Sequence, residues 1–516
     1  MVTAPRPSAS ARAMAPVTMA SRLSRSRASA VSRFFTMPMT VPCTGSPVRC
    51  PCTLYRNSLY DVHVRCPDTP HGGVSQRGIC ELMSPSPHAG QAALSSALTL
   101  GCGLTLPNRL AKAATSEHLA DRFGAPTAQL IQAYRAMAAS GVGLVISGNV
   151  MVDGSSLEAP RNVVIEDDRH IDALRRWSAV TAGTPARFIL QLSHPGRQSM
   201  RGNTLPGRRQ DVVAPSSVPL STGADRLFRP PRALREEEIA DIIGRFARAA
   251  EVAAAAGFHG VQLHAAHGYL LNQFLSPLSN RRTDRWGGSL ENRMRLLIEV
   301  FRAVKTVTPD DFMVAVKLNS ADFQRGGFEP DDSLAVAKAL EAEGVDLIEI
   351  SGGTYENTAM FAGTSPREST RQREAYFMEF AERFSRDVTV PMMLTGGFRT
   401  RQVMIDALTG GAVDVVGLAR PITHDPGFPR DLLAGSAERS SARPRNTGRK
   451  AVDAFLDSAW HQQQLARLGR GKDVRPKRGT AAALLIATFV TMRDILAPRL
   501  GMTFSGPRKR RRRPHG

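Results

Sequence analysis

The feature that most constrains the fold is an alternation of short apolar runs with amphipathic stretches, from about residue 110 to about residue 417. The short runs are typical of buried strands, and the stretches between most of them repeat apolar residues about every 3.6 positions, as helices do. Strands that alternate with helices predict a parallel sheet. The expected strands are 110–114, 143–147, 187–192, 260–264, 312–318, 346–351, 391–395 and 412–417. The expected helices are 127–139, 236–255, 290–306, 332–343, 373–384 and 401–409.

The number of expected strands favours a closed barrel over an open sheet. Eight strands alternating with helices indicate an α/β protein of the (β/α)8 TIM barrel class, and 516 residues leave room for tails on both sides. No Gly-x-Gly-x-x-Gly follows the first strand, which argues against a Rossmann domain. Two short runs, 98–101 and 104–107, surround a Gly-Cys-Gly turn and predict a hairpin ahead of the barrel.

The net charge of +21 is carried by the two ends of the chain. Residues 1–100 sum to +7, residues 101–440 to zero and residues 441–516 to +14. A basic surface that binds nucleic acid would lie within the folded part, so we expect no nucleic-acid partner. The Arg-rich run 508–513 could serve as a nuclear signal or bind nucleic acid, but an inert solvated tail is the favoured interpretation.

The two ends are expected to lie outside the barrel. Residues 1–92 are rich in Arg and Ser and contain no acidic residue before Asp61, as in an organelle transit peptide. An upstream extension without a role, from a misassigned start, is the favoured alternative, so we expect a cytoplasmic protein, or a mitochondrial one if the transit peptide is real. Residues 1–82 should be dispensable for folding. The barrel is placed at 93–440, a helical segment at 441–500 with one amphipathic helix over 452–468, and a disordered tail at 501–516.

All six cysteines precede the expected barrel or lie at its beginning. They are Cys43, Cys50, Cys52, Cys66, Cys80 and Cys102. A disulfide framework or zinc site among the first four is conceivable, but no strand or helix pattern accompanies it, so we expect no metal. Their absence from the rest of the chain favours a reducing compartment. No apolar run approaches the roughly 18 residues of a membrane span, and we expect no membrane partner.

The richest cluster of reactive side chains follows the fourth expected strand, where His264, His267 and Tyr269 come within six positions. Chemistry in a TIM barrel takes place at the C-terminal ends of its strands. A His-x-x-His pair can bind a metal, but a hydrolytic metal barrel would add carboxylates or further histidines at other strand ends. Those ends carry instead Ser116, Gln191, Lys317, Gly396 and Arg420. Such donors and cations suit a planar, electron-rich ligand with a phosphate; alternatively, the histidines are satisfied polar groups under a loop.

The segment 264–284, followed by 286–293, closely resembles the old yellow enzyme family of FMN-binding TIM barrels, in the branch with a His-x-x-His pair. Further matches follow in the family's order over residues 93–435. They are Asn108-Arg109, Gln191–Arg197, Lys317-Leu-Asn, Ser351-Gly-Gly, Thr395-Gly-Gly and Gly417–Pro421. A motif of this length, accompanied by shorter motifs in the family's order, is specific for the family.

The resemblance implies that FMN lies across the mouth of the barrel. It assigns the phosphate to the backbone of Gly396, Gly397, Ala419 and Arg420, with the Arg420 side chain as counter-charge. Backbone N–H groups are fixed dipoles that suit a phosphate. Gln191 is assigned to the pyrimidine edge of the flavin.

Two further strand ends complete the implied flavin contacts. Gly148 should pass beneath the ring, and Lys317 stands where many relatives have arginine, beside flavin N1 and O2, so that its charge stabilises the anionic reduced flavin. Ala114, Thr115 and Ser116 follow the first strand near flavin O4, and Ser116 replaces a cysteine or threonine of the relatives. The run 112–117 also lacks the proline common at this place.

The implied reaction has two halves at one site. NADH or NADPH reduces FMN, and an unsaturated substrate is then reduced at its C=C bond. His264 and His267 would donate hydrogen bonds to the substrate carbonyl, and Tyr269 would protonate Cα. Alternatives are a general NAD(P)H oxidase, a quinone or nitro reductase, or a barrel that binds without catalysis.

The expected partner is a small electrophilic molecule, and a homo-oligomer is compatible with the sequence. A dienoyl-CoA reductase type with an iron–sulfur cluster and an FAD domain is excluded, because no cysteine follows Cys102.

Overall fold

The computed structural model describes residues 53–58, 61–65, 87–222, 225–352, 368–442 and 450–475, with residues 482 and 485. The chain divides into two compact units, 1–84 and 85–516. In the first unit, β1 (Thr53–Ser58) pairs antiparallel with β2 (Asp61–Arg65), so part of the expected disordered extension has regular backbone. The alternative metal or disulfide site at the first four cysteines and the basic tail at 501–516 lie outside the described residues.

The second unit is a closed barrel of eight parallel strands, which confirms the predicted fold class. Each strand pairs in parallel with the next, and the first, β5, pairs with both the second and the last, which closes the barrel. The strands are β5 (Leu110–Lys112), β6 (Leu144–Met151), β8 (Arg187–Ser193), β11 (Gly260–Ala265), β12 (Met313–Asn319), β13 (Leu347–Ser351), β14 (Met392–Thr395) and β15 (Val415–Leu418). The short β7 (Val163–Val164) pairs with β6, and β9 (Val213–Ala214) pairs with β10 (Arg232–Ala233) before α5.

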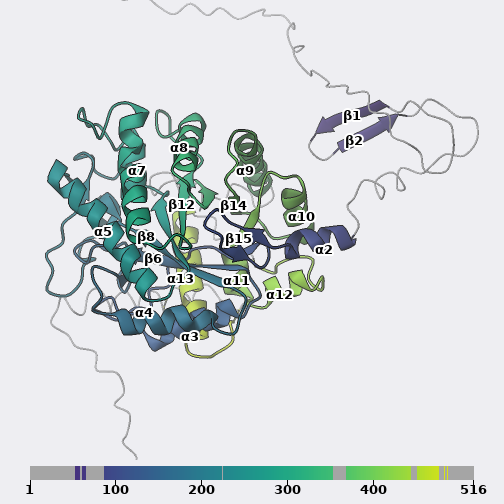
Figure 1. The fold of residues 1–516 in the computed structure, drawn as a ribbon, viewed down its shortest axis with the longest axis horizontal. Coiled ribbons are helices and arrows are strands. Elements are labelled where there is room, and N and C mark those ends of the chain that lie inside the picture. The colour runs from purple at the N-terminus through teal and green to yellow at the C-terminus, as the bar shows by residue number, and fades with distance from the viewer. Residues whose placement is uncertain are drawn as a thin grey trace, which may run out of the picture. The chain divides into compact units, whose positions relative to one another are not determined.

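Helices surround the strands (Figure 1), because each amphipathic stretch buries its apolar face against the outside of the barrel. The longer ones are α3 (Ala128–Ala138), α4 (Ile171–Ser178), α5 (Glu236–Ala255), α7 (Leu290–Val307), α8 (Pro330–Ala342), α9 (Glu368–Asp387) and α10 (Arg401–Thr409). The short ones are α6 (Leu270–Leu275), α11 (Arg420–His424) and α12 (Phe428–Leu433). Helix α3 begins with a side-chain cap, because the Thr127 hydroxyl accepts a hydrogen bond from Leu130 N.

The inside of the barrel has an apolar end and a polar end. Leu144, Met313 and Val415 belong to an apolar cluster at the N-terminal ends of the strands. The predicted hairpin, β3 (Leu98–Thr99) with β4 (Thr105–Leu106), contributes Leu100 and Leu106 to the same cluster and closes that end. Polar side chains are therefore left to the C-terminal ends, where a TIM barrel carries its site.

Two further helices bracket the barrel in sequence. Helix α2 (Pro87–Ser95) contacts α10 and buries Leu94 completely, so packed structure begins before the boundary expected at residue 93. Helix α13 (Lys450–Leu468) confirms the predicted C-terminal helix and packs against α3 and α11. Among the described residues, no helix is both long and apolar enough to cross a membrane.

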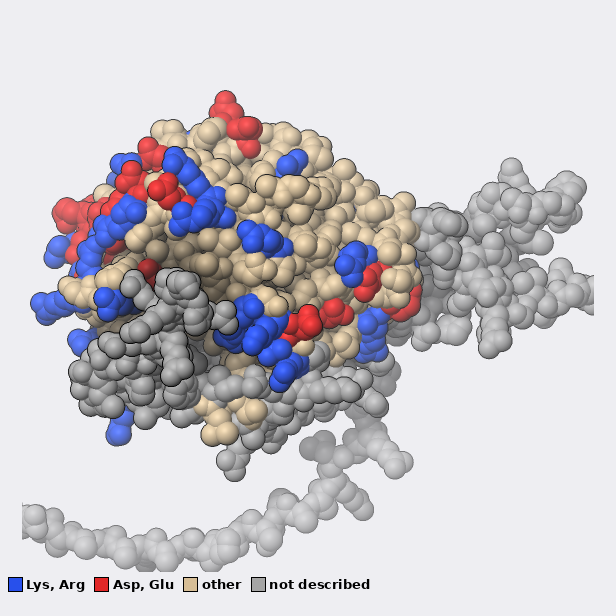
Figure 2. All heavy atoms as spheres, turned by 90° about the horizontal axis from the view of Figure 1, so that it is seen from below, with Lys and Arg blue, Asp and Glu red and all other residues tan. Residues whose placement is uncertain are grey.

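Charged side chains of both signs mix on the described surface, in the part of the chain whose formal charges sum to zero. On the face in Figure 2, basic and acidic side chains lie next to one another over much of the left edge. Arg285 Nη2, for example, lies 2.9 Å from Glu299 Oε1 on α7.

Candidate active site

A chain of buried polar side chains crosses the barrel just below its C-terminal mouth. Gln191 Nε2 donates to Gln262 Oε1 at 2.7 Å, and Gln262 Nε2 donates to Glu349 Oε2 at 2.8 Å. Lys317 Nζ donates to Glu349 Oε1 at 2.8 Å. The four residues come from β8, β11, β13 and β12, and all are at least 96% buried. The cation expected at Lys317 therefore has a carboxylate partner that the sequence analysis missed.

The two predicted histidines meet at the end of β11. His264 Nε2 lies 3.1 Å from His267 Nδ1, and the rings are nearly perpendicular, with centroids 5.2 Å apart. On the far side of each ring stands a further polar group: Asn149 Oδ1 lies 2.9 Å from His264 Nδ1, and Ser351 Oγ lies 2.7 Å from His267 Nε2. The four side chains form one hydrogen-bonded row across the mouth.

Both imidazoles are neutral at pH 7. Burial lowers the pKa of His264 well below its usual range, and the nearby His267 and Lys317 lower it further. Burial and Lys317 do the same to the pKa of His267. A neutral imidazole has one N–H donor and one acceptor nitrogen. Each ring can therefore donate one hydrogen bond.

The direction of the row follows from Asn149. Its Nδ2 donates to Tyr269 OH at 3.4 Å, so its Oδ1 faces His264 and accepts from Nδ1–H. His264 Nε2 then accepts from His267 Nδ1–H, and His267 Nε2 accepts from the Ser351 hydroxyl. In this arrangement both N–H groups are used within the row. Donation from both rings to one substrate oxygen requires His264 to carry its hydrogen on Nε2 instead.

The third predicted side chain, Tyr269, lies beside the pair. It immediately precedes α6, its side chain is buried, and its ring centroid is 4.6 Å from that of His264. The three side chains were predicted to lie together, and the structure brings all three to one place. Asn149 was not predicted to join them; β6 supplies it because that strand continues to Met151 rather than ending at residue 147.

The loop after β5 is more crowded than expected. A Cβ at Gly148 would stand 2.4 Å from both Glu117 Oε2 and Thr115 O, so protein atoms already fill the space next to this glycine. The N–H of Gly148 donates to Glu117 Oε1 at 2.8 Å. Ala114 is partly buried, and Ser116 Oγ donates to Glu158 Oε2 at 3.3 Å. The Thr115 hydroxyl is buried with no hydrogen-bond partner among the described residues.

The loop after β14 leaves backbone open for a ligand, and the loop after β15 adds a basic side chain. Gly396 and Gly397 have φ of +132° and +78°, and a Cβ at Gly396 would meet no atom within 4 Å. Ala419 precedes α11, and the Arg420 side chain there is about one-third exposed. Its Nε lies 3.2 Å from Asp457 Oδ2, so α13 supplies an acidic partner to Arg420. No pattern in the sequence connects this helix with the site.

The His-x-x-His pair does not form part of a metal cluster here. Within the described part of the chain, no group of three or more His, Cys, Asp or Glu side chains could hold a metal ion. The partners of the two histidines are Asn149, Ser193 and Ser351, amide and hydroxyl groups that act through hydrogen bonds.

Comparisons with known proteins identify the family and the fold. The sequence profile of the NADH:flavin oxidoreductase / NADH oxidase family matches residues 94–438. An NADH-dependent flavin oxidoreductase of Talaromyces variabilis is 36% identical over 411 residues, 73% of this chain and 99% of the relative. One of Neonectria sp. (strain DH2) is 40% identical over 357 residues, 65% of this chain, and this chain covers 46% of that relative.

Two solved structures share the fold. An old yellow enzyme homologue from Zymomonas mobilis has a TM-score of 0.57 and 25% identity, and the match covers 68% of this chain and 94% of the homologue. Morphinone reductase has a TM-score of 0.55 and 26% identity, and the match covers 69% of this chain and 92% of that enzyme.

Proposed function

Because the chain belongs to the NADH:flavin oxidoreductase / NADH oxidase family, it is an FMN-dependent oxidoreductase. We propose that it uses NADH or NADPH to reduce the C=C bond of α,β-unsaturated carbonyl compounds. The observation that carries the substrate class is the meeting of His264, His267 and Tyr269 at the barrel mouth. Once His264 carries its hydrogen on Nε2, the pair offers two hydrogen-bond donors to a carbonyl oxygen, and the phenol offers a proton.

The residues present fit FMN. The open backbone at Gly396 and Gly397, with Ala419 and the Arg420 guanidinium, would hold the phosphate. The buried Thr115 hydroxyl has an unused hydrogen, which a ligand oxygen would accept.

The remaining proposed contacts come from the strand ends. Gln191 and Lys317 would face the pyrimidine edge, with Ala114 and Ser116 on the other side and Gly148 below. Because Glu349 is paired with Lys317, the pair presents less positive charge to the flavin than a lone lysine would.

The reaction places demands on this chain's own residues. FMN, when bound, supplies the hydride equivalent that it takes from NAD(P)H. As hydride reaches Cβ of the substrate, negative charge develops on the carbonyl oxygen, and donors aimed at that oxygen stabilise it. For both rings to donate, His264 must move its hydrogen to Nε2, and Asn149 must turn its amide so that Nδ2 donates to Nδ1.

The proton completes the addition. Tyr269 OH delivers H⁺ to Cα, and the overall change is one hydride and one proton added across the C=C bond. A phenol with a pKa near 10 is a weak acid at pH 7, but the developing carbanion is more basic still. The phenol would be reprotonated from solvent.

The test is a pair of half-reactions under anaerobic conditions. The FMN-loaded protein is reduced with NADH or NADPH and then mixed with cyclohex-2-enone, while flavin absorbance is followed. We expect the enone to reoxidise the flavin. When His264 and His267 are both replaced by alanine, the rate of this reoxidation should fall roughly 30- to 1,000-fold, which is about 2 to 4 kcal/mol of transition-state stabilisation. A reduced enzyme that cyclohex-2-enone cannot reoxidise would refute the proposed substrate class.

A further inference from the structure

The turn that carries His267 has an unusual backbone. His267 has φ of +60° and Gly268 has φ of +77°. A side chain other than glycine adopts this left-handed conformation infrequently, and it persists where the surrounding structure holds it. The conformation matters because it sets the His267 ring against His264 and Ser351.

Two buried asparagines hold the turn by its consecutive N–H groups. His267 N donates to Asn319 Oδ1 at 3.1 Å, and Gly268 N donates to Asn272 Oδ1 at 2.7 Å. Asn319 ends β12 and Asn272 lies in α6, and both are at least 99% buried. The two amide oxygens must face the turn for these bonds to form.

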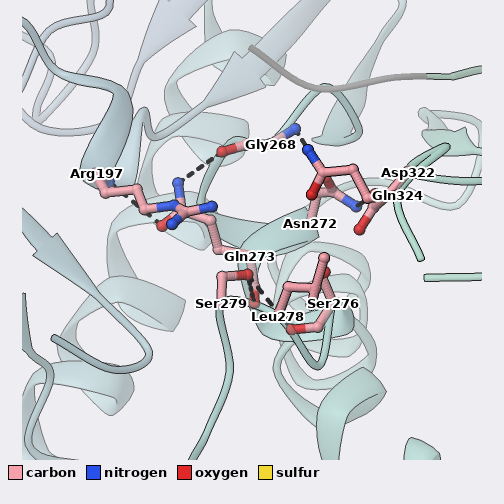
Figure 3. A pocket seen from close by; sticks show the side chains of 9 residues that line it. All are labelled: Arg197, Gly268, Asn272, Gln273, Ser276, Leu278, Ser279, Asp322 and Gln324. Carbon is pink, nitrogen blue, oxygen red and sulfur yellow. Dashed lines mark hydrogen bonds between the residues drawn. The ribbon is translucent and has the colours of Figure 1, made fainter. Parts of the chain in front are cut away.

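One carboxylate decides which way both amides face. Asp322 Oδ1 accepts from Asn319 Nδ2 at 3.1 Å and from Asn272 Nδ2 at 3.5 Å, while Oδ2 accepts from Phe328 N at 3.2 Å. Burial raises the pKa of Asp322, and the hydrogen bonds that its carboxylate accepts from Phe328 N and the two asparagines oppose that rise by stabilising the ionised form. An ionised carboxylate only accepts, so each neighbouring amide must turn its NH2 group toward it and its oxygen away. Asp322 is 99% buried, and a cavity of about 10 Å³, which is room for about one water, lies beside it (Figure 3).

We propose that Asp322 is a positioning residue for the histidine pair: by orienting Asn319 and Asn272, it holds the left-handed turn at His267 and keeps that ring against His264. This inference rests on the proposed function, because it assigns Asp322 to the carbonyl-binding pair. Asp322 acts through the two amides and touches neither ring.

The variant Asp322→Asn keeps the shape and removes the constraint, because a third amide can donate to its neighbours as well as accept. A matched control is Asp346→Asn, at the opposite end of the barrel. That carboxylate is 98% buried and also accepts from backbone, from Cys102 N at 2.8 Å and from Val314 N at 2.7 Å.

The first measurement needs no turnover. Protein with ¹⁵N-labelled histidine is observed by NMR, and the ring signals of His264 and His267 are assigned from single alanine variants. We expect Asp322→Asn to shift both sets of signals and Asp346→Asn to leave them in place. Unmoved signals in a folded Asp322→Asn protein would overturn the proposal, whatever the substrate is.

The second measurement ties the residue to the reaction. We expect Asp322→Asn to lower kcat/KM for cyclohex-2-enone by about 10- to 100-fold, since small displacements of a positioned group have effects of this size. In a His267→Ala background the same change should cause no further loss, because both act through one ring. A further loss of the same size there would contradict the inference.

A second variant tests the same proposal if Asp322→Asn does not fold. Asn319→Ala removes the acceptor of His267 N but leaves the Asp322 carboxylate with Phe328 N as a donor. It should shift the same His267 signals, and wild-type signals in this variant would overturn the proposal. If the wild-type enzyme does not reduce enones but Asp322→Asn shows the expected NMR shifts, the substrate class is refuted and the positioning role stands.

Discussion

Removal of the Lys317 charge tests the electrostatics of the site most directly. The change is Lys317→Met, which keeps most of the side-chain volume and leaves Glu349 without its cation. The Lys317 and Glu349 side chains are 5% and 0% exposed, and Nζ lies 2.8 Å from Oε1. Loss of one partner of such a buried pair costs about 3 to 5 kcal/mol, because the remaining charge stays buried and uncompensated.

The magnitude translates into a thermal shift. At about 2 °C per kcal/mol, the low end for a large domain, the unfolding midpoint should fall by about 6 to 10 °C. The assay is circular dichroism on FMN-free protein, so that lost cofactor binding does not contribute.

A surface pair provides the matched control. Lys338 Nζ lies 3.3 Å from Asp387 Oδ2, and these side chains are 50% and 44% exposed. Solvent screens such a pair, so Lys338→Met should cost less than about 1 kcal/mol. The double variant Lys317→Met with Glu349→Gln should recover at least half of the loss. Equal midpoints for the two Lys→Met proteins would refute the argument.

Three further predictions concern the chemistry. Tyr269→Phe should slow enone reduction more than reduction of a quinone, which takes its protons on oxygen from water; equal losses in stopped-flow assays would make Tyr269 structural. Asp457→Ala should weaken FMN binding to the apoprotein but not riboflavin binding, with Asp457→Asn near wild type, since Asp457 positions the Arg420 guanidinium for the phosphate; titration calorimetry with both ligands decides this. Asn149→Asp should hold the hydrogen of His264 on Nδ1 and raise the pKa of that imidazole, so that the rate of enone reduction falls. The pH profile of that rate should then show a histidine inflection between about pH 6 and 8. The wild-type profile should show none, because the pKa of His264 lies well below its usual value.

The strand–helix order of the barrel was predictable because it depends on local patterns. Apolar periodicity placed helices such as α5 and α10 with the bounds that the structure has. Helix α2 was missed, because it is short and shows no acidic residue in its first turn and no basic residue in its last. Its place depends on the burial of Leu94 against the rest of the fold, which no local pattern announces.

The site was predictable where its residues lie close together in the sequence. His264, His267 and Tyr269 are close in sequence, so their meeting needs little more than the fold class. Asn149 and Ser351 are distant along the chain, and they reach the histidines because β6 and β13 end at the same mouth as β11. A single Glu in the apolar run 347–351 was the available signal for Glu349.

What the sequence by itself determined is the order of the barrel's elements, the end of the barrel at which chemistry is concentrated and the family resemblance, because these depend on periodicity and on one contiguous motif. The tertiary structure alone decided which buried groups face one another: Glu349 against Lys317, Asp322 beneath the turn at His267, and Asp457 against Arg420. The physical reason is that a hydrogen bond or ion pair depends on ångström distances between elements far apart in the chain. Strand register and helix packing set those distances, and neither is written in any local stretch of sequence.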